Sequence, residues 1–232
     1  MLELRRSNER GAADHGWLKS FHTFSFADYF DPKHVEFGSL RVINEDRVQP
    51  GAGFGTHGHQ NMEILSYVLE GELSHKDSMG NGSTIRPGDV QLMSAGQGIR
   101  HSEFNGSQTD GVHFLQIWIK PNVLGKTPSY QEKHFSVEDK RGKLRLIVSP
   151  DGADGSLLIY QDAKVYVGLF DGEEKASLPI DSNRKAYIHL ARGRAVVNGQ
   201  QLQAGDGLQL SDTDSVNISN GVEAEVLVFD LN

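Results

Sequence analysis

Short apolar stretches separated by turn residues run along most of this chain. Residues 40–44, 64–73 and 112–120 are rich in branched and aromatic side chains, which fit the pleated surface of a strand. Between such stretches, residues 49–53 and 77–82 carry the Gly, Pro, Asn and Asp that form tight turns. A Pro-Gly turn at 87–88 likewise divides the apolar residues between 84 and 93. Many short strands with closely spaced turns predict an all-β protein, built as a sandwich or barrel.

The same pattern occurs twice. Residues 187–197 repeat the pattern of 67–73, with Gly193 in the place of Gly71. Residues 203–210 then parallel 86–92, and a Gly-Asp pair stands at the matching position in both copies. Self-similarity of this kind predicts two tandem barrels from an internal duplication. We place the connection near residues 122–142 and expect one barrel over 1–130 and the other over 131–232.

Two short pieces in the first copy carry side chains that bind metals. His57 and His59 are two residues apart, and so are His101 and Glu103. On a strand, such residues project from the same face, about 6.5–7 Å apart. Two such strands meeting in a barrel would bring three imidazoles and one carboxylate around a point. A divalent first-row metal with bonds of about 2.0–2.2 Å fits there.

The histidines are concentrated in the first copy. Eight of the ten lie at or before position 113, and residues 171–181 of the second copy contain none. We therefore expect the chemistry in the first barrel and a scaffold in the second. A lone histidine is usually a surface or a hydrogen-bonded core residue, and five are interpreted so: His15, His22, His34, His75 and His134. His113 and Gln116 have opposite parity on one strand, so only one of them can face the interior.

Composition narrows the class of protein further. The 232 residues include no cysteine, which excludes disulfides, iron–sulfur clusters and thiolate zinc sites and leaves nitrogen and oxygen ligands for any metal. A net charge of −8 without a basic block argues against binding to nucleic acid. The charged first residues and the absence of a long apolar stretch predict a soluble, cytoplasmic protein without signal peptide or membrane span.

Two spaced motifs resemble those of the cupin superfamily. The first motif is matched by Gly51, His57, His59, Glu63 and Gly71. The second is matched by Pro87, Gly88, Asp89, Gly98, His101 and Asn105, although Gly96 stands where a proline is usual. The amino-acid sequence is similar to that of bacterial members of the pirin family of bicupins at residues 57–63 and 95–103. The same similarity is found in the stretches 21–32, 148–152 and 155–157. This resemblance covers nearly the whole chain and is most specific over residues 51–118.

The resemblance implies one metal ion in the N-terminal barrel. Its ligands would be His57, His59, His101 and Glu103, matched position by position. Many cupins use the motif-one glutamate instead, so Glu63 is the second choice, or a partner of an imidazole N–H. Iron is the first choice for the metal, with Mn, Ni, Co, Cu or Zn as alternatives.

The resemblance also implies an activity: quercetin 2,3-dioxygenation, in which O₂ opens a flavonol ring and carbon monoxide is released. Glu103 would then also accept the flavonol hydroxyl proton. Phe24, Phe26 or Phe54 would stack on the planar substrate.

The alternative is a redox-responsive regulatory pirin that binds a protein partner without turnover. An open channel to the metal favours the enzyme, and a sealed site favours the sensor. A third hypothesis is a sugar isomerase or epimerase. It is disfavoured because residues 51–118 contain no cluster of basic side chains that could bind the phosphate of a sugar phosphate or nucleotide. A monomer is expected, since two packed barrels cover each other.

Overall fold

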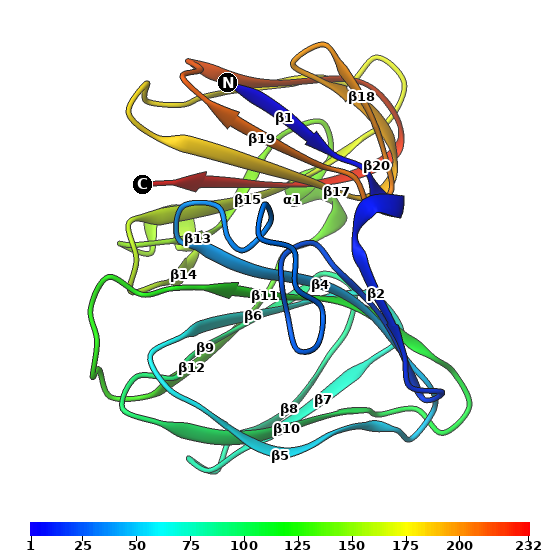
Figure 1. Ribbon diagram of the computed structural model, residues 1–232, viewed down its shortest axis with the longest axis vertical. Helices are drawn as coiled ribbons and strands as arrows, with labels where there is room; N and C mark the ends of the chain where they lie inside the picture. Colours follow the sequence, from blue (N-terminus) through cyan, green and yellow to red (C-terminus); the bar gives the residue numbers. More distant parts are fainter.

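Three β-sheets make up the computed structural model, which describes residues 1–232 (Figure 1). A seven-stranded sheet runs in the order β12-β9-β6-β11-β4-β3-β2 and faces a four-stranded sheet in the order β5-β10-β7-β8. Together they form the first barrel. Their strands are β2 (Gly11–Asp14), β3 (Leu18–His22), β4 (Leu40–Val48), β5 (Gly53–His59), β6 (Glu63–Glu70), β7 (Leu73–Asp77), β8 (Gly82–Ile85), β9 (Asp89–Ser94), β10 (Ile99–Asn105), β11 (Val112–Ile119) and β12 (Ser129–His134).

A nine-stranded sheet forms the second barrel. Its main path is β1-β19-β17-β20-β15-β13-β14, with β16 paired to β20 and β18 to β17. These strands are β1 (Leu2–Arg5), β13 (Arg145–Ser149), β14 (Leu157–Leu158), β15 (Ala163–Phe170), β16 (Ala176–Pro179), β17 (Lys185–Val197), β18 (Gln200–Gln203), β19 (Gly207–Ser211) and β20 (Ser215–Leu231). The helical segments are α1 (Val137–Lys140) and two 3₁₀ turns, Ser7–Glu9 and Ala153–Gly155. No helix is long and apolar enough to cross a membrane.

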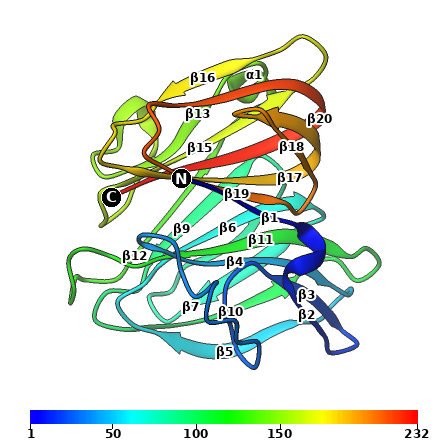
Figure 2. The same cartoon turned by 45° about the horizontal axis from the view of Figure 1, so that its top comes forward.

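The two barrels are stacked on each other, and the seven-stranded sheet lies between the two interiors (Figure 2). One face of that sheet packs against the second barrel: Leu65, Leu115 and Ile117 share a cluster of 24 buried apolar residues with Val165 and Phe229. Strands buried on both faces read as nearly continuous apolar runs. This explains why residues 64–69 of β6 lack the alternation of a half-exposed strand.

The interiors of the two barrels differ. The second barrel is filled by 15 buried apolar residues, Ile188, Leu190 and Val226 among them. In the first barrel two smaller apolar clusters, one around Phe114 and one around Met93, lie apart. Buried polar side chains also occupy this barrel: Ser66, His75, Gln91, His101, Glu103 and Gln116. The two interiors thus differ in packing, while the division into a metal-binding barrel and a scaffold barrel stays a prediction.

The matching glycines of the two copies have the same backbone role. Gly71 and Gly193 adopt φ of +76° and +67°, a region that favours glycine. A Cβ on Gly71 would lie 2.5 Å from the carbonyl oxygen of Gly111, and one on Gly193 would meet that of Val222. Both positions thus bring two chain segments too close for any side chain, as expected for duplicated units.

The ladders place two segments across the expected division at residue 130. Strand β1 pairs with β19, so the first residues of the chain belong to the second barrel. Strand β12 pairs with β9 and extends the seven-stranded sheet to His134. A chain end that pairs with a distant strand leaves no local sequence signal, so these pairings were not predicted from the sequence. The division of the chain at residue 130 stays a prediction.

Candidate metal centre

Strands β5 and β10 are hydrogen-bonded neighbours, and their ladder aligns the two predicted pairs. His101 lies opposite His57 in the antiparallel register. The imidazole ring centroids are 4.8 Å apart for His57 and His59, 4.5 Å for His57 and His101, and 4.8 Å for His59 and His101. One ring nitrogen from each lies within 4.8 Å of the others. Three of the four predicted side chains therefore converge on one point.

The distances within this cluster fit a metal ion. The Nε2 atoms of His57 and His101 are 3.0 Å apart. Two nitrogens bound at about 2.1 Å and at right angles would be separated by about 3.0 Å. The Nδ1 atom of His57 lies 2.8 Å from the carbonyl oxygen of Gly55, to which it donates as Nδ1–H. That bond leaves the Nε2 lone pair of His57 facing the cluster.

Two of the three imidazoles, those of His59 and His101, are kept neutral, as metal ligands must be. Burial, with a smaller contribution from His57, lowers the pKa of His59 to about 4. Burial and the neighbouring histidines lower the pKa of His101 to about 3. At neutral pH both rings therefore keep a free lone pair.

Glu103 lies in the same interior but in a second group. Its side chain is fully buried, and its two oxygens accept hydrogen bonds from Ser66 Oγ at 3.0 Å and Gln116 Nε2 at 2.6 Å. Burial raises the pKa of Glu103, and the hydrogen bond from Ser66 opposes that rise. Its carboxylate lies within 4.8 Å of ligand atoms of His75 and His101. His101 thus belongs to both groups.

His75 is the residue that sequence reasoning missed. It is 1% exposed and sits on β7, where the register places it opposite Glu103 and places Asp77 opposite His101. A signal was available, because His75 and Asp77 are spaced i, i+2 like the two pairs that were singled out. His22, also interpreted as ordinary, lines the pocket described below.

Glu63, the second-choice ligand, lies in neither group. One of its carboxylate oxygens accepts hydrogen bonds from Ser94 Oγ at 2.7 Å and from the Tyr160 backbone N–H at 3.4 Å. The parity argument for β11 is confirmed: Gln116 points inward to Glu103, whereas His113 points the other way, with Nε2 3.0 Å from Glu45.

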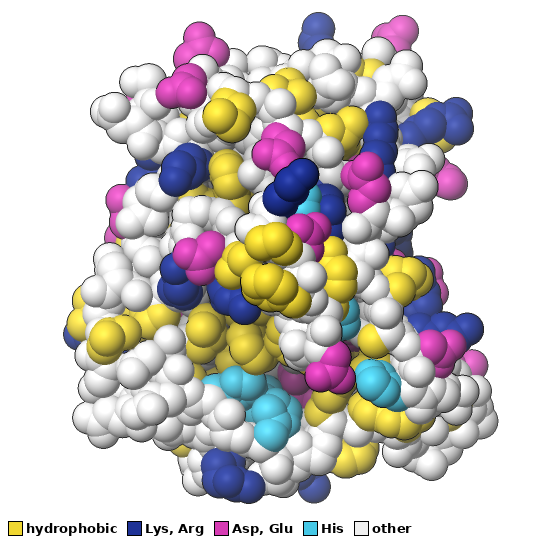
Figure 3. Space-filling model, viewed as in Figure 1, with side chains coloured by type: hydrophobic (Ala, Val, Ile, Leu, Met, Phe, Trp, Pro, Cys, Tyr) yellow, Lys and Arg dark blue, Asp and Glu magenta, His cyan; other side chains and the backbone are white.

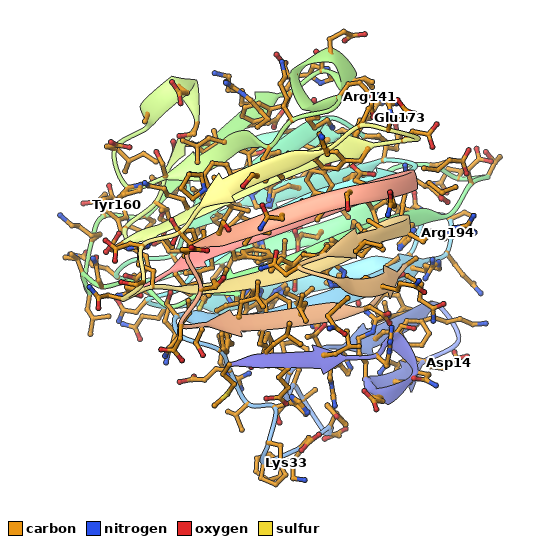
Figure 4. The ribbon with its side chains drawn as sticks, turned by 90° about the horizontal axis from the view of Figure 1, so that it is seen from above. Asp14, Lys33, Arg141, Tyr160, Glu173 and Arg194 are labelled. Carbon is orange, nitrogen blue, oxygen red and sulfur yellow. The ribbon has the colours of Figure 1, made fainter.

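A pocket of about 590 Å³ opens beside His57 and His59, and histidine side chains reach the surface in the lower half of the molecule (Figure 3). One set of lining residues is aromatic: Trp17, Phe26, Tyr29, Phe54 and Trp118. Another is polar: Ser20, His22, Asn44, Asp46 and Gln116. Phe26 and Tyr29 come from the β3–β4 connection, which projects beyond the sheets at the labelled Lys33 (Figure 4).

The structure places two of the three phenylalanines expected to meet the substrate in the pocket wall, while their stacking on a substrate stays a prediction. Phe26 and Phe54 line the pocket, and Trp118 packs edge-on against both His59 (5.0 Å between ring centroids) and Phe26 (5.4 Å). The expectation for Phe24 is wrong. It is 1% exposed and packs 5.6 Å from Tyr187 in the core between the barrels. Phe24 and Phe26 lie beyond the end of β3 at His22, so the i, i+2 rule of a strand does not keep them on one face.

Two family models match most of the chain, and relatives match it along its whole length. The Pirin model matches residues 3–119, and the model described as a quercetinase C-terminal cupin domain matches 146–231. A protein of Escherichia coli K12 named quercetin 2,3-dioxygenase is 47% identical over 231 residues, covering 100% of this chain and 99% of that protein. A pirin-like protein of Caulobacter vibrioides is 39% identical over 232 residues, with 99% of each chain covered.

Solved structures agree with the sequence matches. The crystal structure of YhhW from E. coli superposes with a TM-score of 0.96 at 46% identity, covering 100% of this chain and 98% of that one. Its complex with nickel(II), described as a bacterial pirin, has a TM-score of 0.95 at 46% identity and covers 100% and 99%. With two cupin barrels, a histidine cluster in the first, and these matches over its full length, the chain belongs to the pirin family.

Proposed function

We propose that this protein is a metal-dependent dioxygenase that opens the ring of a flavonol such as quercetin with O₂ and releases carbon monoxide. The observation that carries the proposal is the pocket of about 590 Å³ whose wall includes His57 and His59. Its size falls within the range of about 300–1,000 Å³ typical of small-molecule sites. The name of the E. coli relative, quercetin 2,3-dioxygenase, supports the same substrate class.

The proposed ligands of one divalent ion are His57, His59, His101 and Glu103. The cluster of three imidazoles and the 3.0 Å separation of two Nε2 atoms support the three histidines. Glu103, on the same strand as His101 and buried beside it, is the carboxylate that can complete the set. Nitrogen and oxygen donors suit iron, manganese, nickel, cobalt or copper. We propose iron or nickel as the first metals to load, nickel because a related pirin was solved with it.

When bound, the ion would supply a Lewis acid for a substrate hydroxyl and a redox-active centre for dioxygen. The protein's own groups would then handle the proton. Glu103 is the proposed acceptor, because it lies beside the cluster and Gln116, which binds one of its oxygens, lines the pocket. A carboxylate whose pKa is raised by burial accepts a proton more readily than one in water.

The two kinds of pocket residue suit a flat, hydroxylated substrate. Phe26, Phe54 and Trp118 provide ring faces and edges against which an aromatic ligand can stack and which exclude water. Asp46 and Asn44 offer oxygen acceptors for the ring hydroxyls of the same ligand. The alternative, a metal-responsive binding protein without turnover, would use the same ligands, but it gives no role to a pocket that reaches them.

The decisive experiment compares metal-loaded protein in air and under anaerobic conditions. We expect quercetin consumption and carbon monoxide release that both require O₂ and a loaded metal. His57→Ala should lose metal and activity, whereas His134→Ala, at an exposed histidine that pairs with Asp89, should keep both. If stoichiometrically loaded protein produces no carbon monoxide in air, the dioxygenase proposal is wrong, whatever the metal content.

A further inference from the structure

A chain of buried side chains continues from the proposed ligand His101 away from the metal. The Nδ1 atom of His101 lies 3.4 Å from Nδ1 of His75, and Nε2 of His75 lies 3.3 Å from Oδ2 of Asp77. The side chains of His75 and Asp77 are fully buried. We propose that His75 and Asp77 are positioning residues: they fix the orientation and the tautomer of His101 and so strengthen its bond to the metal. This inference rests on the proposed metal site but not on flavonol turnover.

The direction of the hydrogen bonds follows from the chemistry of the two ends. A carboxylate only accepts, so Asp77 must receive the proton of His75 Nε2–H. His75 then has a lone pair on Nδ1, which can accept from His101 Nδ1–H. With its proton on Nδ1, His101 has its lone pair on Nε2, the atom that lies 3.0 Å from Nε2 of His57. The carboxylate of Asp77, at one end of this series of side chains, therefore selects the tautomer of His101 that binds metal at the other end.

The surroundings hold this chain in place. The carboxylate of Asp77 accepts the backbone N–H groups of Met79 and Asn81 and the side-chain amide of Asn81, at 2.8–3.0 Å. The ring of Tyr130 stacks on His75 at 5.0 Å with an interplanar angle of 27°. His75 therefore has little freedom to rotate, and its contact with His101 is built by the β7–β10 ladder.

Such outer partners matter in metal sites. A ligating histidine usually donates its second N–H to a carboxylate or carbonyl, and loss of that partner typically weakens metal binding by about 10–100-fold. His57 has a backbone carbonyl in this role, that of Gly55. His101 has instead a second imidazole backed by a carboxylate, which gives it a more polarised acceptor than a neutral ring alone.

The substitution Asp77→Asn tests the last residue of this hydrogen-bonded series of side chains. The asparagine oxygen can keep the contacts to the backbone N–H groups of Met79 and Asn81. Its NH₂ group then faces His75 Nε2 and the side-chain amide of Asn81. His75 must accept there and carry its proton on Nδ1, where it opposes His101 Nδ1–H. We expect Ni²⁺ affinity, measured by competition with a chelator, to fall about 10-fold or more. Asp77→Glu should recover part of it, and His134→Gln, at the exposed histidine paired with Asp89, should leave it unchanged.

A second measurement does not depend on affinity. Long-range ¹H–¹⁵N spectra of histidine-labelled, Zn²⁺-loaded protein report which nitrogen of each ring carries a proton. We expect the Nε2–H tautomer for His75 and the Nδ1–H tautomer, with metal on Nε2, for His101. A proton on Nδ1 of His75, a metal-bound nitrogen of His75, or wild-type Ni²⁺ affinity in folded Asp77→Asn would overturn the inference. If wild-type protein binds neither ion, the metal site itself is wrong and this inference falls with it.

Discussion

Replacement of Glu103 by glutamine separates chemistry from folding. The carboxylate is fully buried and accepts two hydrogen bonds, from Ser66 and Gln116. A glutamine of the same shape can accept from Gln116 through its oxygen and donate to the Ser66 hydroxyl through its amide. The swap also removes a buried charge. We therefore expect the free energy of unfolding of metal-free protein to change by less than about 1 kcal/mol.

The effect on turnover should be far larger. An amide cannot accept the substrate proton, and loss of a general base typically costs a factor of about 10²–10⁴ in rate. This corresponds to about 3–5 kcal/mol in activation free energy. The amide is also a weaker metal ligand than the carboxylate. We expect kcat for quercetin, normalised to bound metal, to fall by at least a hundredfold while the thermal unfolding transition stays in place.

Glu63→Gln is the matched control. Glu63 is a 2% exposed carboxylate in the same barrel, and a serine hydroxyl donates to it as in Glu103, but it lies outside both histidine groups. Its substitution should leave metal content and kcat within about twofold of wild type, as for a site with no part in the reaction. Full activity in Glu103→Gln, or a loss of equal size in Glu63→Gln, would refute the assignment.

Three further predictions concern the pocket and the barrel interface. Burial, with Glu103 and Glu45 nearby, raises the pKa of Asp46 to about 7. Since the unfolded value is about 4, the native state retains this proton longer, and Asp46 lowers stability as pH rises from about 4 to 7. Asp46→Asn should remove this pH dependence and raise the free energy of unfolding of metal-free protein by at most about 4 kcal/mol above pH 7. Denaturant titrations at several pH values measure this, and an identical pH dependence in both proteins would contradict it. Tyr67→Phe removes a hydroxyl that donates to the buried carboxylate of Glu225 at 2.5 Å across the interface. It should destabilise the protein by about 1.5–3 kcal/mol in denaturant melts, and an unchanged midpoint would count against this bond. Phe26→Ala removes a pocket ring and should raise KM for quercetin by roughly tenfold with little change in kcat, whereas a selective loss of kcat would indicate another role.

The sequence predicted most of what depends on local spacing. The turns around residues 77–82 and 87–88 are present between β7 and β8 and between β8 and β9. The repeated glycines mark equivalent points of the two units, and the i, i+2 rule put His57 and His59 on one face of a strand. These features follow from the alternation of a strand and the conformational demands of a turn, which a chain carries in its own residues.

Other features depend on which strands become neighbours. His75 and Asp77 had the same spacing as the two histidine pairs, but only the pairing of β7 with β10 brings them to His101. Phe24 and Phe26 have the i, i+2 spacing of one strand face, yet Phe24 faces the second barrel and Phe26 faces the pocket. No spacing rule distinguishes these cases, because the choice depends on which surface each side of the segment meets.

By itself, the sequence determined an all-β fold in two copies and three of the side chains that converge near the pocket, because strand periodicity and motif spacing are local properties. Only the tertiary structure decided that Glu103 groups with His75 rather than with His57 and His59, that the first strand joins the far barrel, and that the histidines border an open pocket. Those outcomes are set by long-range ladders and by the packing of one barrel against the other, where residues distant in the chain become neighbours.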